Sequence, residues 1–168
     1  MPFGTVPASV KTDSNFVVTW VPSAGIADPE APTAAELNAA TVVDLTYSLT
    51  TSGYTRTATQ ASEEDARLTL ADVLQTPGKV THSLELQHVT GAEDNPADAV
   101  LVEGAVGYIV ERRAVDIDTD FTAGQTVSVL PVTVGYPRPD APTANGVFTR
   151  TVTLFPRGKV ASDVAVVA

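Results

Sequence analysis

The chain of 168 residues is long enough to bury a hydrophobic core, and we expect one domain over 1–168. It has 20 acidic and 10 basic residues, which give a formal charge of −10. Proteins that bind a phosphate backbone need clustered lysine and arginine, so this balance argues against direct binding to nucleic acid. It has no cysteine, which excludes a disulfide framework and thiol catalysis. No apolar run approaches the roughly 18 residues of a membrane-spanning helix, so we expect no membrane partner.

The residue choice favours β-structure. Valine occurs 25 times and threonine 23 times, and their β-branched side chains pack well on a pleated sheet but lose rotamer freedom in a helix. Twelve prolines and eleven glycines interrupt the chain at short intervals, as turns between strands do. The composition therefore predicts a mainly β fold, either a sandwich or a barrel.

The beginning of the chain predicts a flexible N-terminal arm over about 1–14 and a first strand over 16–21. Thr33 and Glu36 have the spacing of a capping box, in which the two side chains bond each other's backbone amides. This pair predicts a short helix that ends near residue 38.

Alternating apolar and polar residues predict a strand over 43–49. A turn at Ser52-Gly53 is expected to lead into a second strand over 54–59, which makes a hairpin. The stretch 61–76 is ambiguous, and we expect irregular structure with a short strand. A long strand over 79–89 follows, with polar residues on one face.

The second half of the chain begins with the clearest helix, over about 95–103. Asn95 is placed to cap it, Pro96 suits its first position and Gly104 ends it. Pro131 predicts an edge, a bulge or a corner, since proline cannot donate to a sheet. The expected strands are 105–111, 127–134, 147–155 and 160–168.

Residues with catalytic chemistry are few. His82 and His88 are the only histidines, and six residues along one strand place them about 20 Å apart, too far to bind one ion together. Asp116, Asp118 and Asp120 resemble the start of a calcium loop, but Phe121 replaces its glycine and Val127 its final glutamate. We therefore expect no enzyme activity, no cofactor and no metal, and keep the three aspartates as a weak calcium candidate.

The C-terminal end favours assembly. An uncharged, β-prone end would be an aggregation hazard if its edge stayed open, so it either lies inside the sheet or pairs with a neighbouring subunit. Both alternatives stay open. The candidate interface residues are Trp20, Val164, Val166 and Val167.

Several segments together resemble the major tail proteins, or tail tube proteins, of long-tailed, non-contractile bacteriophages, especially those of actinobacterial hosts. The resemblance runs from about residue 12 to the end. It rests on the order of the segments and on their residue types, without an invariant chemical signature. The segments that carry it are 32–39, the hairpin up to Gly53-Tyr54, 77–79, 107–112, 121–125, 127–135 and 158–166.

This resemblance implies a β-sandwich or barrel of the tail tube type, with one flanking helix and long loops between subunits. Six copies would form a ring around a channel, and the rings would stack into a tube in the virion tail, assembled in the host cytoplasm. The bridging segments between rings would be 23–42, 55–76 and the two termini. The other partners would be the tape-measure protein in the lumen, the tail terminator and the tail tip proteins.

The charge fits a conduit through which DNA passes without specific binding. Six copies, each with −10, would carry a formal −60 per ring, and acid facing the lumen would repel DNA. Two polar strand faces are candidates for lumen or outer surfaces: Thr149, Thr151 and Thr153, and Thr81, Ser83, Glu85 and Gln87. The alternatives are another virion β-protein, such as a head decoration or tail-terminator subunit, and a monomeric binding module.

Overall fold

The computed structural model describes residue 4 and residues 7–68 and 72–168, and its fold is mainly β, as predicted. Of the helices in these ranges, none has the length and apolar character needed to cross a membrane. The elements are β1 (Phe16–Pro22), α1 (Ala34–Leu37), β2 (Val43–Asp44), a 3₁₀ turn (Thr46–Ser48), β3 (Leu49–Asp65), β4 (Leu74–Val89), α2 (Pro96–Val100), β5 (Val106–Arg113), β6 (Thr126–Val134), β7 (Arg138–Pro139), β8 (Thr149–Pro156) and β9 (Ala161–Ala165).

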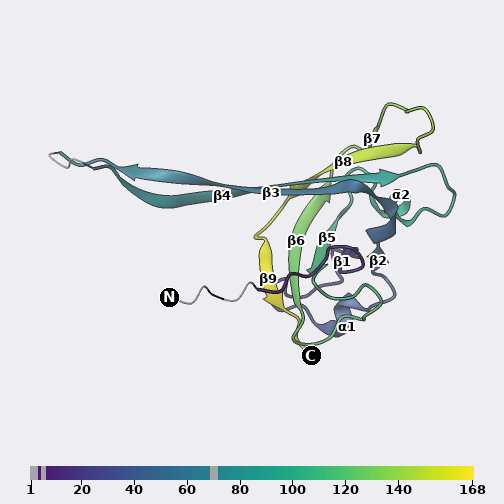
Figure 1. Cartoon of the computed structure of the whole chain (residues 1–168), viewed down its shortest axis with the longest axis horizontal. Coiled ribbons are helices and arrows are strands. Elements are labelled where there is room, and N and C mark those ends of the chain that lie inside the picture. The colour runs from purple at the N-terminus through teal and green to yellow at the C-terminus, as the bar shows by residue number, and fades with distance from the viewer. Residues whose placement is uncertain (1–3, 5–6, 69–71) are drawn as a thin grey trace.

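All the strands belong to one antiparallel sheet that wraps around the protein core (Figure 1). The strand order is β2-β1-β5-β6-β8-β4-β3, while β7 adds to β8 and β9 adds to β6. The strand β6 changes partner along its length, from β9 at Thr126–Val129 to β8 at Val132–Val134. Pro131 lies between these two segments, so the predicted corner is where the sheet passes from one partner to the next.

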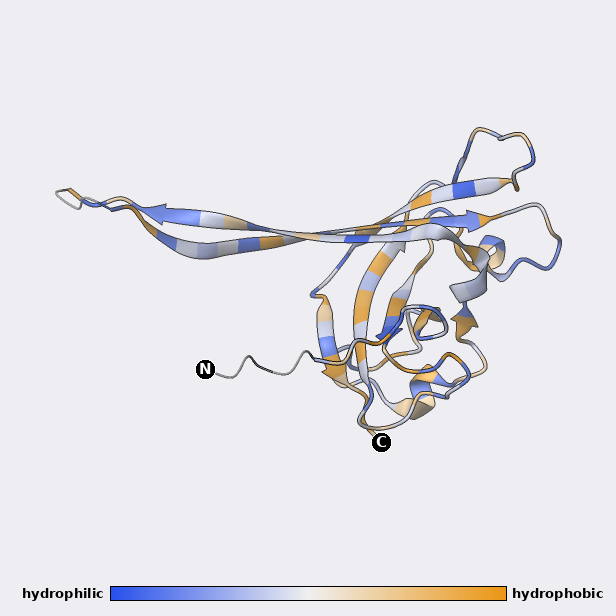
Figure 2. Cartoon of the chain, in the orientation of Figure 1, coloured by the Kyte–Doolittle hydropathy of each residue, from blue (hydrophilic) through white to orange (hydrophobic). Residues whose placement is uncertain are grey.

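Two apolar clusters lie on opposite faces of the β1-β5-β6 part of the sheet. The first fills the space between these strands, β4, β8 and α2, and includes Trp20, Leu86 and Leu130. The second is covered by segments around α1, by the loop before β6 and by the C-terminal end, and includes Val110 and Val166. In Figure 2 the strands of the body are correspondingly rich in hydrophobic residues.

The short helix α1 confirms the capping-box prediction. The Thr33 hydroxyl accepts a hydrogen bond from the Glu36 amide at 3.2 Å, and the Glu36 carboxylate accepts one from the Thr33 amide at 2.8 Å. The Thr33 amide, with help from the Ala27 amide, lowers the pKa of Glu36 despite its partial burial. One carboxylate therefore fixes both the helix start and the loop before it.

The predicted strand over 43–49 and its turn at Ser52-Gly53 are wrong. The Asp44 carboxylate accepts hydrogen bonds from the amide and hydroxyl of Thr46, which bends the chain into a 3₁₀ turn. Gly53 lies in a bulge within β3, where a Cβ atom would be 2.2 Å from the Gln87 carbonyl oxygen. Close approach to β4, and not chain reversal, requires this glycine.

The stretch 61–76 is also more regular than predicted, because its described residues mostly belong to β3 and β4. Residues 69–71 of this stretch lie outside the described residues. The helix α2 is confirmed, with Asn95 as its cap and Pro96 in its first turn, but it ends at Val100 instead of 103. Gly104, with φ of 81°, lies beyond that end, and its amide bonds Val134 as the chain enters β5.

The predicted N-terminal arm lies only partly in the described residues. Residues 4 and 7–14 are exposed and belong to no helix or strand, while 1–3 and 5–6 lie outside the description. The flexibility of 1–14 and the single-domain boundary stay predictions.

Candidate assembly surfaces

A long β-hairpin projects from the body of the protein (Figure 1). β3 and β4 pair from Tyr54–Leu86 out to Asp65–Leu74, but β8 pairs with β4 only from Leu84 to Val89. We call the described residues beyond this point, 57–68 and 72–83, the arm. Its β3 strand alone extends about 26 Å from residue 57 to 65 at 3.3 Å per residue.

The arm has little apolar material to stabilise it. Most of its residues are exposed, and in Figure 2 it is largely hydrophilic or neutral. A two-stranded ribbon is at best marginally stable in water. Four exposed apolar side chains lie along it or near its end: Leu68, Val73, Leu74 and Val80. The arm therefore has the character of a segment that another molecule covers.

One face of the sheet formed by β3, β4 and β8 is lined with hydroxyl groups. Residues directly opposite in an antiparallel pair share a face. The pairs are Thr55–Glu85, Thr57–Ser83, Thr59–Thr81, Glu85–Thr153 and Gln87–Thr151. The structure thus places the two polar strand faces noted in the sequence on one surface, which we call the hydroxyl face. Where this face lies on the body, its reverse side carries buried leucines and valines of the first cluster.

Asp140 organises one end of the hydroxyl face. Its carboxylate accepts hydrogen bonds from Thr149 at 2.8 Å, Thr151 at 2.9 Å and the Gln87 amide at 3.0 Å. Burial disfavours the charged carboxylate, but the bonds from Thr149, Gln87 and Thr151 outweigh it and lower the pKa of Asp140. The carboxylate is therefore ionised near neutral pH, and it joins the segment after β7 to β4 and β8.

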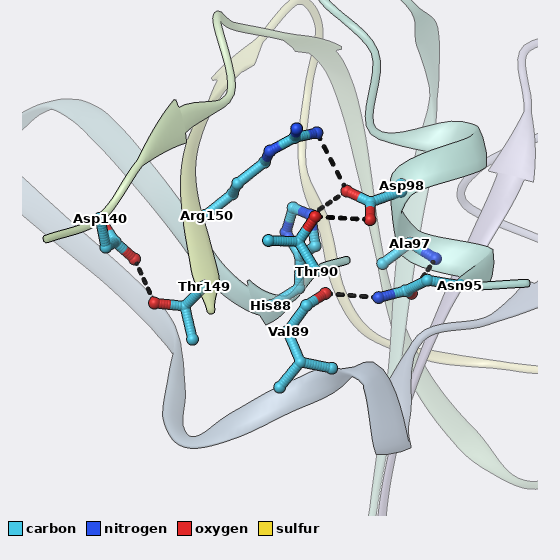
Figure 3. A network of polar contacts seen from close by, with 9 residues as sticks. All are labelled: His88, Val89, Thr90, Asn95, Ala97, Asp98, Asp140, Thr149 and Arg150. Atoms are coloured by element: carbon cyan, nitrogen blue, oxygen red, sulfur yellow. Dashed lines mark hydrogen bonds and ion pairs between the residues drawn. The ribbon is translucent and has the colours of Figure 1, made fainter. Parts of the chain in front are cut away.

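A second polar network lies on the core side, where β4 leads into α2 (Figure 3). The Asp98 carboxylate accepts hydrogen bonds from Thr90 at 2.7 Å and Arg150 at 3.2 Å, and it lies 3.2 Å from Nε2 of the buried His88. Burial opposes ionisation of Asp98, but Thr90, His88 and Arg150 lower its pKa. His88 thus connects β4 to the helix, while His82 lies far along the same strand.

Glu111 is the centre of a buried ion-pair cluster at the base of the arm. Its side chain is 2% exposed, and it accepts hydrogen bonds from Tyr54, Arg56 and Arg113. Burial raises the pKa of Tyr54, and the Glu111 carboxylate raises it further, so the phenol stays protonated and donates. No sequence pattern pointed to the bonds from β3, since Tyr54 and Arg56 lie more than 50 residues from Glu111 in the chain.

The acidic loop after β5 is built around Arg112. This guanidinium is buried, donates to the Asp116 carbonyl at 3.0 Å and to the Gln125 side chain at 3.2 Å, and lies over the Phe121 ring. Burial lowers the pKa of Arg112, while the Asp120 and Asp116 carboxylates oppose that shift. The loop thus has a resident cation of its own.

Of the three aspartates of the calcium candidate, Asp116 uses its carboxylate within this loop, while Asp118 and Asp120 take part through backbone groups. The Asp116 carboxylate accepts from the Asp118 amide at 2.9 Å, and the Asp120 carbonyl accepts from Gln125 at 3.1 Å. Within the ranges that the structure describes, no three His, Cys, Asp or Glu side chains are grouped to bind a metal.

We accordingly predict that millimolar calcium leaves the melting temperature of the protein unchanged. The reason is that Arg112 already supplies the positive charge around which the loop folds. A thermal melt followed by circular dichroism, with magnesium as the matched control, measures this. A rise with calcium and not with magnesium would show that the loop binds the ion.

The candidate interface residues fall into two groups. Trp20 and Val166 are 4% and 2% exposed and pack inside the two apolar clusters, and Gly107 makes room for the indole, since a Cβ there would be 2.5 Å from it. Val164 is half-buried, while the Val167 side chain is 39% exposed. A contact of any of the four with another copy stays a prediction.

The C-terminal end is bonded to the body of its own chain. Val166 exchanges backbone hydrogen bonds with Gln125 and Gly124, and Val167 exchanges them with Pro32 and Ala34, at 2.8 to 2.9 Å. The pairing of β9 with β6 continues this attachment. Of the two alternatives for this end, these bonds support placement inside the sheet.

Comparison with known proteins gives one family. A family model described as "Phage tail tube protein" matches residues 4–168, which is essentially the whole chain. No curated protein sequence matches it.

Proposed function

Because the chain belongs to the phage tail tube protein family, it is a structural protein of the virion tail that associates with itself, and we propose that its copies form stacked rings around a channel. In this proposal the rings are hexamers, and the part of the hydroxyl face that lies on the body lines the lumen. The tube belongs to a long, non-contractile tail and delivers DNA.

The observation that supports this proposal most is the sheet β7-β8-β4-β3. One side of it packs on the core and the other is the polar hydroxyl face. In the described residues β3 pairs only with β4, so its outer edge is open along most of its length. Open edges invite pairing with another chain. A neighbouring copy that pairs with this edge would continue the sheet around a channel.

The arm is the proposed bridge between rings, in agreement with the expectation for 55–76. It reaches beyond the body, and its open edge and exposed apolar residues lack cover within the protomer. The tape-measure protein, the tail terminator and the tail tip proteins are the further proposed partners, with assembly in the host cytoplasm.

Electron microscopy of the purified protein tests the proposal. Long hollow tubes at high protein concentration, with sixfold rings in cross-section, are the expected result. Discrete particles would favour the alternative of a head decoration or tail-terminator subunit. A protein that stays monomeric in sizing chromatography at every concentration would contradict self-assembly.

The lumen assignment makes a separate prediction. Thr55→Lys with Thr153→Lys places two cations on the part of the hydroxyl face that lies outside the arm, and tubes of this variant should retain short duplex DNA that wild-type tubes release. The retention should fall steeply as salt rises, because DNA binding by lysine releases counterions. A filter-binding assay with labelled DNA measures it.

The control for that prediction is Thr122→Lys with Ala123→Lys, which adds the same charge to an exposed loop on another part of the body. If the channel is where short duplexes are retained, the two lysines of this control lie outside it. The control should then bind DNA no better than wild type. Equal binding by both variants would contradict the assignment of the hydroxyl face to the lumen.

A further inference from the structure

The side chain of Arg56 joins the base of the arm to two separate strands of the body. One guanidinium nitrogen donates to the Glu111 carboxylate on β5, and the other donates to the Ser162 hydroxyl on β9 at 2.7 Å. The Arg56 side chain is 14% exposed and Glu111 is 2% exposed. A guanidinium is planar with fixed donor directions, so two acceptors on different strands restrict its position.

Beyond Arg56, nothing comparable ties the arm to the body in the described part of the chain. The side-chain hydrogen bonds of the described arm residues stay inside the arm, as in Gln60 to Gly78, Arg67 to Asp65 and Gln75 to Glu64. The third strand, β8, ends its pairing with β4 at Leu84. A two-stranded ribbon of this length is free to bend where its last support ends.

Glu111 has more donors than one ion pair needs. Tyr54 also lies on β3 and donates to the same carboxylate, and its ring packs edge-on against Phe16 at 5.2 Å between centroids. Arg113 donates from the exposed side at 3.0 Å. In a site that excludes water these bonds are strong. The carboxylate is therefore a fixed point to which two consecutive inward-facing residues of β3 attach.

We propose that the Arg56–Glu111–Ser162 contact is a latch that sets the direction in which the arm leaves the body. Its role in assembly rests on the proposed function: an arm that bridges rings must leave every copy at the same angle. Glu111 and Arg56 are positioning residues in this sense, and they need not touch a neighbouring copy.

The absence of native cysteine allows a direct test with spin labels. One label pair, Gln75→Cys with Thr122→Cys, joins arm and body, and another, Ser23→Cys with Thr122→Cys, lies within the body. Double electron–electron resonance measures both distance distributions. Labelled protein is diluted in excess unlabelled protein, so that each pair reports on a single chain.

We expect Glu111→Gln and Arg56→Met each to broaden and shift the arm–body distribution and to leave the body–body distribution as in wild type. Arg113→Met is the matched contrast: Arg113 bonds the same carboxylate, but from β5 and with 63% exposure, so the arm–body distribution should change little. If Glu111→Gln does not fold, Arg56→Met and Ser162→Ala give the same readout with the carboxylate intact.

An unchanged arm–body distribution in folded Arg56→Met would overturn the latch, even if that variant melts earlier. An equal change in Arg113→Met would overturn it as well, since the effect would then come from the charge cluster as a whole. Wild-type protein that shows a narrow arm–body distance but never forms tubes would contradict the proposed function and leave the latch standing.

Discussion

Replacing residues 59–81 by Asn-Gly should give a folded protein that forms no tubes. The last pair retained is Ala58–His82, and Asn-Gly suits a two-residue turn between antiparallel strands. The contacts of Arg56 and Glu111 with the body stay in place, and the described residues removed, 59–68 and 72–81, contribute nothing to the two apolar clusters. We therefore expect the melting temperature to stay within a few degrees of wild type.

The loss of tubes follows because part of the arm is left uncovered by its own chain. It has an open edge and exposed apolar residues at its far end, and the proposal assigns both to a neighbouring ring. Negative-stain micrographs and sedimentation of the polymer measure the effect, and circular dichroism checks the fold. We expect the critical concentration for polymerisation to rise at least about tenfold, which corresponds to about 1.4 kcal/mol or more per copy.

A matched variant separates the ribbon from its apolar end. Leu68→Ser with Val73→Ser keeps the full arm and removes only exposed apolar side chains. This variant should polymerise at a higher critical concentration than wild type. Normal tubes from the shortened protein would show that the arm does not bridge rings.

The body of the fold was predictable because its strands are runs of β-branched and apolar residues, which in β1, β5 and β6 are buried against an apolar cluster on each face. Strands near β1, β5 and β6 followed from valine-rich runs and the strand near β8 from its β-branched residues, while α1 and α2 followed from their caps. The partner change in β6 was signalled by Pro131, since a missing amide makes an uninterrupted ladder impossible. These signals are local, and each concerns residues close together in the chain.

The arm was not predictable on the same basis. Its residues are exposed on both faces, so no apolar period marks it, and Glu63-Glu64-Asp65 has the composition of a solvated loop. Gly53 is typical of a turn in sequence and occupies a bulge in the fold. The Glu111 cluster joins residues 55 and 57 positions apart, and such a contact arises only when the sheet has formed.

Deleting Val164–Ala168 should remove most of the folding stability of the protein. Val166 is buried in the second apolar cluster, and burying a valine side chain contributes about 1.5 to 3 kcal/mol. Val166 and Val167 also make four backbone hydrogen bonds, each with a net value of about 1 kcal/mol. A loss of about 6 kcal/mol is comparable to the whole stability of a small domain, so we expect an unfolded or aggregated chain.

Two point variants make this prediction quantitative. Val166→Ala should lower the free energy of unfolding by about 2 kcal/mol, because it removes buried methyl groups and leaves a cavity. Val167 is 39% exposed, and Val167→Ala keeps its backbone hydrogen bonds. This variant should change the free energy of unfolding by less than about 0.5 kcal/mol. Urea unfolding measures both changes. When the dependence of the unfolding free energy on urea concentration stays constant, the shift of the midpoint gives the change in stability. If the truncated protein unfolds at the wild-type urea midpoint but does not polymerise, the C-terminal end lies in an interface between copies. If the truncated protein forms normal tubes, the end is needed neither for folding nor for that interface.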